Sequence, residues 1–467
     1  MDDKDVTIAQ LQDENHLFRE QVQLLKDEIT SLRDEIARLK KNSGNSSKPP
    51  SSDIVKPSKP KGRGIRKRKR GGQKGHKKFE RPSFPPQEID QIIEYELRDQ
   101  DAQGLIPLDQ WQVVQQVELV TKPFLVTEHR ARKYRDPKTG QMIITPLPDA
   151  VKQGGLLGPK LTAMVAYQKG DCHMTYSTIQ RFLKDVIGLS VSRGQLAKVV
   201  RKVSNALQLP YEALSGALPE QPQLGIDETG HKDSGQLMWT WCFLAEAFTV
   251  FHLHPSRGSR VLQKVLGKTF GGTIGCDYYG AYRKYVREGD VRVQYCLAHL
   301  IREIRFLANH SNRRLSRWGQ KLLEGLKKLF DTLHRRETLT PKGFIRSMER
   351  IRQAFLRTMR RPPDHAEAKK LAKRFRGAQA QSYFTFLTEP GVEPTNNATE
   401  RAIRQVVIDR RVTQGTRGNR GQRWSERIWT ILATCRQQNR SAFEFIYQAT
   451  ISHWTHQPCP SLLPQGL

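Results

Sequence analysis

Long apolar runs and a secretory leader are both missing from this sequence. No 18 consecutive residues are apolar, so no segment is expected to span a membrane. The opening residues, Met1-Asp2-Asp3-Lys4-Asp5, lack the basic and apolar regions of a secretory signal. We therefore expect a cytoplasmic protein that has no membrane partner.

Paired cysteines are missing as well. The six cysteines are scattered and none form a CxxC spacing, which argues against a disulfide framework and against a zinc ribbon. We expect the thiols to be reduced.

Acidic residues are few relative to basic ones. The 467-residue chain has 78 Lys and Arg against 47 Asp and Glu, a formal net charge of +31. A field of this sign favours a polyanionic partner, and nucleic acid is the first candidate. The length allows about three domains and a sizeable core.

A strict heptad pattern runs from residue 8 to residue 40. β-branched residues at most a positions and Leu at most d positions favour a parallel two-stranded coiled coil, and Asn15 at an a position fixes its register. Oppositely charged g and e residues would attract each other across such a dimer: Glu14–Arg19, Glu28–Arg33 and Glu35–Lys40. The predicted seam consists of Ile8, Leu11, Asn15, Phe18, Val22, Leu25, Ile29, Leu32, Ile36 and Leu39. The alternative is a long amphipathic helix packed on its own domain, but the narrow stripe favours the dimer.

Residues 42–86 form a Ser-, Pro- and Gly-rich segment with a basic run. Fourteen Lys or Arg lie between Lys48 and Arg81, against only Asp53 and Glu80, so the segment is not expected to build a core of its own. We expect it to bind DNA phosphates without sequence preference, unless it is a solvated linker only. The predicted contacts are Arg66, Lys67, Arg68, Lys69, Arg70, Lys74, Lys77 and Lys78.

Residues 87–207 predict a small β-rich module followed by helices. The expected strands are Gln91–Leu97, Val113–Val120, Phe124–Arg132 and Met142–Thr145, with a turn at residues 136–140. The expected helices are Pro159–Lys169, Thr175–Ile187 and Ser192–Leu207, with Ser192 as an N-cap. Gly188 lies in the turn between the last two, as in a helix-turn-helix. Plain packing of a helix pair is equally compatible with this pattern; in the DNA-reading alternative, base edges would be contacted by Arg193, Gln195 and Lys198.

The stretch Gln223–Lys232, QLGIDETGHK, is typical of a short strand that delivers Asp227 to the interior of a sheet. A buried carboxylate needs a cation or a metal. Three antiparallel strands, a crossover helix and a fourth strand ending in Asp277 are predicted, the first half of a ribonuclease-H-like sheet; the segments after the first strand are 237–245, 248–254, 256–267 and 271–276.

If the fourth strand lies beside the first, about 4.8 Å away, Asp227 and Asp277 can share divalent ions as in two-metal phosphoryl-transfer sites. The alternative is that each aspartate is a turn or cap residue.

The later part of the chain supplies candidates for a third carboxylate. A fifth strand at 291–295 leads into a helix that begins near His299, which either lies beside the carboxylates or is packed in the helix start. Residues 311–388 are helical, basic and without readable chemistry, and indicate an insertion. Thr395 is expected to cap a helix on which Asn396, Asn397, Glu400 and Arg404 share one face, and Arg401 is a further secondary site residue. Glu303, Glu324 and Glu367 compete with Glu400, and an exposed, salt-bridged Glu is the simpler alternative. An Arg- and Gly-rich stretch that follows is expected to track phosphates, with Arg410, Arg411, Arg417 and Arg420.

An ordered set of motifs now resembles one known family. NSSKPPSSD after a zipper, GGQKGH, DET, DYYGAY, CLAH and NNATERAIR occur in that order, and the chain resembles the transposases of the insertion-sequence-sixty-six family over nearly its whole length. The resemblance implies a ribonuclease-H-like catalytic domain with a triad of Asp227, Asp277 and Glu400, and it raises His299 as a further site residue.

The resemblance also implies two Mg²⁺ or Mn²⁺ held by that triad, cleavage at element ends, and strand transfer by the freed 3′-OH. The implied partners are terminal inverted repeats and target DNA, a second copy of the chain or a higher synaptic assembly, and accessory proteins of the same element. The implied location is the nucleoid of a bacterial cytoplasm. The family's cysteine-paired zinc module has no cysteine here in residues 98–140, so no structural zinc is expected.

The predicted fold is therefore multidomain α+β. Its parts are a coiled coil (1–41), a basic linker (42–86), a β-rich module (87–150), a helix-turn-helix-like domain (151–218), a catalytic domain (219–310 and 389–423) with a helical insertion (311–388), and C-terminal helices (424–467). The rival hypothesis is a noncatalytic zipper dimer that binds DNA or regulates transcription on a decayed nuclease-like scaffold. A junction resolvase or ribonuclease H would explain the triad but not the zipper and the basic arm.

Overall fold

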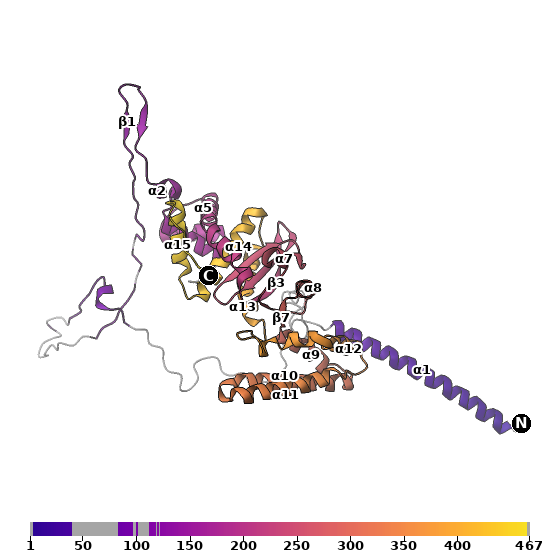
Figure 1. Ribbon diagram of the computed structural model, residues 1–467. Helices are drawn as coiled ribbons and strands as arrows, with labels where there is room; N and C mark the ends of the chain where they lie inside the picture. The colour runs from indigo at the N-terminus through magenta and orange to yellow at the C-terminus, as the bar shows by residue number, and fades with distance from the viewer. Residues whose placement is uncertain are drawn as a thin grey trace.

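The computed structural model describes residues 3–39, 83–96, 100, 112–117, 119–120 and 122–464 as a mixed α+β chain with two sheets (Figure 1). The predicted DNA contacts from Arg66 to Lys78 lie outside these residues. None of the described helices is both long enough and apolar enough to cross a lipid bilayer.

The chain begins with one long helix, α1 (Asp3–Leu39), which projects from the rest of the molecule (Figure 1). The large apolar seam residues whose side chains are described are exposed along it, from Leu39 at 65% to Val22 and Ile29 at 46%. Near its end, Ala37 packs against the main hydrophobic core. The helix is as predicted, and the described apolar seam residues are exposed along it, whereas its pairing with a second copy stays a prediction.

A two-stranded hairpin replaces the expected β-rich module. After a short 3-10 turn at Pro86–Glu88, the antiparallel strands are β1 (Lys133–Arg135) and β2 (Met142–Ile144). The carboxylate of Asp136 accepts hydrogen bonds from the Lys138 backbone and the Thr139 hydroxyl and closes the predicted turn. The described parts of the other three expected segments form no strand. Both faces of this hairpin are exposed. The alternating apolar and polar residues of this region therefore have no hydrophobic core to pack against.

A helical unit follows, with a core of its own around Leu183 and Leu196. Its helices are α2 (Asp149–Gly154), α3 (Pro159–Gly170), α4 (Tyr176–Phe182) extended by a π-helical turn (Leu183–Ile187), α5 (Arg193–Ala206) and α6 (Gln208–Gly216), with a 3-10 turn at Leu218–Glu220. The Ser192 hydroxyl accepts a hydrogen bond from the Gln195 N–H at 3.1 Å and caps α5, as predicted. Gly188 has φ of 81°, which lets the chain reverse between the two helices.

Five strands form the central sheet in the order β5-β4-β3-β6-β7. The first three are antiparallel, and β6 and β7 run parallel to β3. Their bounds are β3 Gln223–Asp233, β4 Gln236–Leu244, β5 Thr249–His254, β6 Thr273–Cys276 and β7 Arg292–Tyr295. The predicted strand beside the first is therefore found, with Gln223 opposite Thr273 and Gly225 opposite Gly275.

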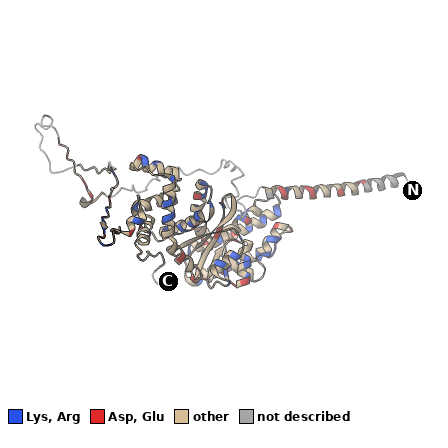
Figure 2. Ribbon diagram, turned by 90° about the horizontal axis from the view of Figure 1, so that it is seen from above, with Lys and Arg blue, Asp and Glu red and all other residues tan. Residues whose placement is uncertain are grey.

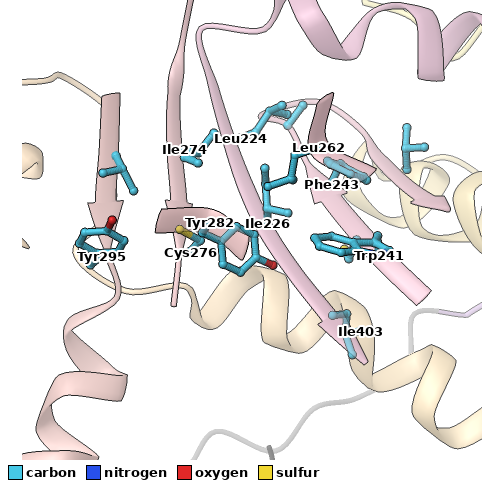
Figure 3. Packing of buried hydrophobic residues seen from close by; sticks show 14 of the residues in the cluster. Leu224, Ile226, Trp241, Phe243, Leu262, Ile274, Cys276, Tyr282, Tyr295 and Ile403 are labelled. Carbon is cyan, nitrogen blue, oxygen red and sulfur yellow. The ribbon is translucent and has the colours of Figure 1, made fainter. Parts of the chain in front are cut away.

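The two faces of β3 meet different helices. Leu224 and Ile226 point toward Leu262 of α7 (Arg260–Leu266) and Tyr282 of α8 (Gly280–Gly289), in a buried cluster drawn in Figure 3. The opposite face lies against α13 (Asn397–Thr413), and a Cβ on Gly225 would stand 2.2 Å from the Thr399 hydroxyl. Because side chains alternate along a strand, Asp227 shares the α13 face with Gly225.

Both edges of the sheet are covered. The outward backbone N–H groups of β5 at Thr249, Phe251 and Leu253 donate to side chains of α14 (Gly418–Gln437), namely Thr434, Thr430 and Glu426. At the other edge, β7 is tied to two 3-10 turns, Gly377–Tyr383 and Thr385–Leu387, by the hydroxyl of Thr385 and the side-chain amide of Gln294.

The remaining helices flank this sheet. After α9 (Leu297–Ala308), the predicted insertion at residues 311–388 is helical, as expected. Its helices are α10 (Arg313–His334), α11 (Pro341–Met359) and α12 (Ala366–Lys373), with a 3-10 turn at Arg336–Thr338. The last helix, α15 (Ala442–Trp454), packs on α3, where Phe443 meets Tyr167 edge to face.

Candidate active site

Two aspartates lie at the same level of neighbouring parallel strands, Asp227 within β3 and Asp277 directly after the end of β6. The β3–β6 register pairs Gly225 with Gly275, and two more residues along each chain lead to Asp227 and Asp277. Adjacent strands lie about 4.8 Å apart, so the two carboxylates emerge side by side from the sheet on the face toward α13. The Asp277 carboxylate also accepts the Tyr279 N–H at 2.9 Å, which orients it at the start of α8.

The surroundings of both aspartates oppose their negative charge. Burial raises the pKa of Asp227 well above its usual range, and the charges of Glu228 and Asp277 raise it further. Burial likewise raises the pKa of Asp277, although nearby His299 and Arg257 favour its ionised form. Among the described residues, no Lys or Arg forms an ion pair with either aspartate. The pair is therefore an electrostatically strained site that a cation would relieve.

Helix α13 brings Glu400 to the same face of the sheet. It begins at Asn397 with Asn396 as N-cap, one residue later than the predicted cap at Thr395. The shift has a physical cause, because Asn396 is buried and bonded on two sides: its N–H donates to the Cys296 sulfur at 3.2 Å and its side-chain amide donates to the Ile226 carbonyl at 2.9 Å. This tie to β3 fixes where the first turn of α13, and Glu400 in it, can lie.

Glu400 meets two residues of α9. The Arg302 guanidinium lies 3.2 Å from one carboxylate oxygen, and Nδ1 of His299 lies 3.7 Å from the other. Arg302 also donates to Nε2 of His299 at 3.3 Å, so Nε2 is an acceptor and the proton of the neutral ring belongs on Nδ1, facing Glu400. Burial lowers the pKa of His299, and the charge of Asp277 opposes this shift. His299 therefore lies close to Glu400 and interacts electrostatically with Asp277.

The competing carboxylate Glu303 has a different partner. It forms an ion pair with Arg374 of the loop after α12 at 2.6 Å. Its charge still reaches the site, since it contributes to raising the pKa of Asp277. Glu324, by contrast, is exposed on α10.

Glu228 is a buried carboxylate that sequence reasoning missed. It follows Asp227 on β3 and points to the other face, where it pairs with Arg257 at 2.6 Å and accepts a hydrogen bond from Tyr282. Burial and the charge of Asp277 raise its pKa to about 7, against the opposing effect of Arg257. The signal available in the sequence was the acidic pair in DET, in which Glu228 directly follows Asp227.

Aromatic rings hold the arginines around this centre. The Arg257 guanidinium stacks between Trp239 and Tyr279, at 4.5 and 3.9 Å from the ring centroids. Tyr278 lies 4.3 Å from the Arg374 guanidinium. The tyrosines of DYYGAY therefore position cations on both sides of Asp277, a role that the motif alone did not predict.

Models of known protein families match parts of this chain. Residues 154–423 match the family model described as Transposase IS66 family. The chain belongs to the IS66 family of transposases. Residues 2–82 match a second model, a family of unknown function (DUF6444). No curated protein matches the chain in sequence.

Membership in the IS66 family confirms the predicted resemblance and gives the chain a transposase role, with DNA binding and nucleic-acid cleavage in the broad sense. The matched region begins in α2, contains β3 to α13, and ends inside α14. It therefore includes Asp227, Asp277 and Glu400, and it leaves out the hairpin and α15.

The other predicted site residues take several positions. Asn397 and Arg404 are exposed on α13, and Arg401 lines a separate cavity with Ala398 and Gln405, to which Glu400 does not contribute. Arg410 donates to the Thr229 hydroxyl at 2.9 Å and so braces α13 against β3. The remaining predicted DNA contacts within the described chain are exposed: Arg193, Lys198, Arg411, Arg417 and Arg420. The Arg- and Gly-rich stretch is helical from Gly418, earlier than the helix start expected at Trp424.

Proposed function

We propose that this IS66-family member is a metal-dependent DNA transposase with a ribonuclease-H-like core and a catalytic triad of Asp227, Asp277 and Glu400. The observation that carries the proposal is the parallel pairing of β3 with β6, whose register brings Asp227, within β3, level with Asp277, directly after β6. The sheet order, with three antiparallel strands and then two parallel ones, supports the ribonuclease-H-like core. Glu400 on a helix across the same face supplies the third carboxylate.

The residues present fit a divalent cation. Two half-buried carboxylates with raised pKa values favour a positive ion between them. Asp227, Asp277 and Glu400 would hold Mg²⁺ or Mn²⁺ through hard oxygen ligands. When bound, such ions would lower the pKa of a water and neutralise charge on the phosphoryl oxygens. No structural zinc is proposed.

The chain's own residues then do the positioning. Arg302 orients the Glu400 carboxylate and also donates a hydrogen bond to His299. In the proposed reaction, water attacks a phosphodiester at the element end and breaks the bond to the 3′ oxygen. The freed 3′-OH then attacks a phosphodiester of target DNA, without a covalent enzyme intermediate.

DNA contact is proposed for three basic parts of the chain. They are the arm with Arg66–Lys78, the start of α5 with Arg193 and Lys198, and the region of Arg411, Arg417 and Arg420. Lys and Arg recur on the helices around the sheet in Figure 2, as a phosphate-binding surface requires. The proposed partners are terminal repeats, target DNA and accessory proteins of the element, in a nucleoid-associated, cytoplasmic setting. A second copy would pair through the seam of α1.

Substitution of the triad tests the proposal. Asp227→Ala, Asp277→Ala and Glu400→Ala should each lower end cleavage by at least about a hundredfold, because each removes a metal ligand, while DNA binding is retained. Cleavage of labelled terminal-repeat DNA in Mg²⁺ measures the first effect and a gel-shift titration the second. Glu324→Ala, an exposed carboxylate on α10, is the control and should keep both activities. Full cleavage by Glu400→Ala would move the third ligand elsewhere, Glu303 first.

One observation favours the noncatalytic alternative, a zipper dimer that binds DNA on a decayed scaffold. Glu400 is already neutralised by Arg302, as an inactive carboxylate would be. Mn²⁺ titration of the same variants distinguishes the metal-dependent transposase from the noncatalytic DNA-binding dimer. A competent site binds Mn²⁺ with a stoichiometry that drops in Asp227→Ala and not in Glu324→Ala, whereas a decayed site shows no such difference.

A further inference from the structure

A buried cluster away from the carboxylates joins α1 to the helical insertion. Asp34 of α1 places one carboxylate oxygen 3.3 Å from Nε2 of His310 and 3.3 Å from Nε2 of His365. His310 follows α9, His365 caps α12, and the two side chains are only 3% and 9% exposed. Figure 1 shows the end of α1 beside α12.

The hydrogen bonds of the two rings assign their protons. Nδ1 of His310 accepts the Asn312 N–H at 3.1 Å, and Nδ1 of His365 accepts the Glu367 N–H at 3.3 Å. In a neutral ring whose Nδ1 is an acceptor, the proton is on Nε2. Both Nε2–H groups therefore donate to the same Asp34 oxygen. A metal ion at this place would need the lone pairs of both Nε2 atoms, and both backbone bonds to Nδ1 would be lost, so the hydrogen-bonded form is favoured.

The contact lies on the side of α1 that a coiled coil leaves free. In the heptad that places Ile29 and Ile36 at a, Asp34 is an f residue and Ala37 a b residue, both on the outer face of the helix. The seam near the contact stays exposed, with Ile29 at 46%, Leu32 at 51% and Ile36 at 48%. The insertion thus contacts α1 through the outer heptad positions of α1, and the seam of α1 stays exposed.

We propose that the helical insertion is the seat of the dimerisation helix: the Asp34–His310–His365 clasp and Ala37 fix α1 on the insertion and present its seam to a second copy of the chain. The occupant of the seam follows from the heptad and from the g–e pairs Glu14–Arg19 and Glu28–Arg33, which attract only across a parallel pair. The inference rests on the proposed dimer. It assigns a role to an insertion in which the sequence shows no chemistry, and it sets the two catalytic domains of a dimer at a defined separation.

A matched pair of substitutions tests the clasp. Asp34→Ala removes the acceptor of both rings, whereas Asp27→Ala removes the same residue type from the same heptad position one heptad earlier, where Asp27 bonds only to Gln23 of its own helix among the contacts described. Genetically encoded spin labels at Ser31 and Lys321, two exposed positions on α1 and α10, report the distance between helix and insertion in the full-length chain. Mixing labelled protein with an excess of unlabelled protein removes distances between labels on two copies, so that only distances within one chain are measured.

The wild type and Asp27→Ala should give one narrow distance distribution, and Asp34→Ala a distribution several-fold broader. In Asp34→Ala, cleavage of two ends together should fall several-fold relative to cleavage of single ends. Circular dichroism checks that its helices remain. An unchanged narrow distribution in Asp34→Ala would overturn the clasp.

Two further readouts keep the clasp apart from other proposals. A monomeric wild type with a narrow distribution would refute the dimer and leave the clasp standing. The zinc content of the purified proteins tests whether a metal ion bridges Asp34, His310 and His365. About one equivalent of zinc in the wild type and in Asp27→Ala, but none in Asp34→Ala, would show a metal-bridged cluster. That result would overturn the hydrogen-bonded clasp.

Discussion

Three acidic side chains of this chain lie in surroundings that favour their protonated forms. Asp227 and Asp277 are half-buried and Glu228 is buried, and loss of solvent is the largest cause of the raised pKa of each. Apolar side chains at these positions would make the folded state more stable, because burying an uncompensated charge costs free energy. The arrangement is understandable if the cost is recovered when a cation enters.

The pKa of Glu228 leads to a prediction for the metal-free protein. Its folded-state pKa of about 7 lies above the ordinary value of 4.5, so the protonated group stabilises the fold. That contribution is complete below about pH 4.5 and is lost as the pH rises through about 7. Glu228→Gln should therefore flatten the fall in unfolding free energy across this window, by an amount on the order of 2 kcal/mol.

Thermal unfolding in EDTA at a series of pH values measures the effect. Glu324→Gln, at an exposed position, should leave the wild-type pH dependence unchanged. Equal slopes for Glu228→Gln and the wild type between pH 4.5 and 7 would show that Glu228 does not titrate with the raised pKa.

At the scale of elements, the approach of α13 to β3 decides where Glu400 lies. A Cβ at Gly225 would stand 2.2 Å from the Thr399 hydroxyl and 3.2 Å from the side-chain oxygen of Asn396. The absence of a side chain at Gly225 is what lets the helix lie on the strand at this point.

Gly225→Ala should therefore displace α13. We expect a loss of about 1–3 kcal/mol in unfolding free energy, as for other overpacked sites, together with reduced end cleavage. Gly230→Ala on the same strand is the control, since its Cβ would have nothing nearer than Leu237 at 3.9 Å. Adding Thr399→Ala should restore part of the activity of Gly225→Ala. Denaturant unfolding and the cleavage assay give both readouts, and wild-type values for Gly225→Ala would refute the idea that this contact seats the helix.

Much of the element pattern could be predicted from the sequence because its causes are local. The alternation in QLGIDETGHK gave the first strand, and Ser192 and Gly188 marked where α5 begins and the preceding turn lies. The hairpin shows the limit, since alternation in residues 124–132 had no core to pack against. The start of α13 was misplaced for a related reason: Asn396 is bonded to Cys296 and Ile226, which lie far away in sequence.

The candidate site divides in the same way. Asp227, Asp277, His299 and Glu400 could be proposed from motifs, whereas the ion pair of Arg302 with Glu400 depends on how α9 crosses α13. The burial of Glu228 was equally out of reach, because it depends on Tyr282 and Arg257 arriving from two other elements.

At the scale of the whole molecule, the middle of the α1 seam exposes large apolar side chains, among them Val22, Leu25, Ile29 and Leu32. A polar substitution on the seam should abolish the dimer. Leu25→Glu at a d position should give a monomer by light scattering and lose paired-end cleavage, because charge in the seam opposes pairing. Leu24→Glu is the control, since Leu24 is 70% exposed and lies one position outside the seam. A dimer that survives Leu25→Glu would place the interface elsewhere.

The covered rims of the central sheet have a consequence for how copies of this protein can associate. Strand-by-strand accretion, the usual route to fibrils, needs a row of free backbone groups. Here the amides of β5 are engaged by α14 and the outer side of β7 by the turns that follow the insertion. Within the part of the chain that the structure describes, copies of the protein can therefore associate through helical surfaces but not by pairing the edge strands of their sheets. Copies bound close together on DNA would not form a continuous sheet.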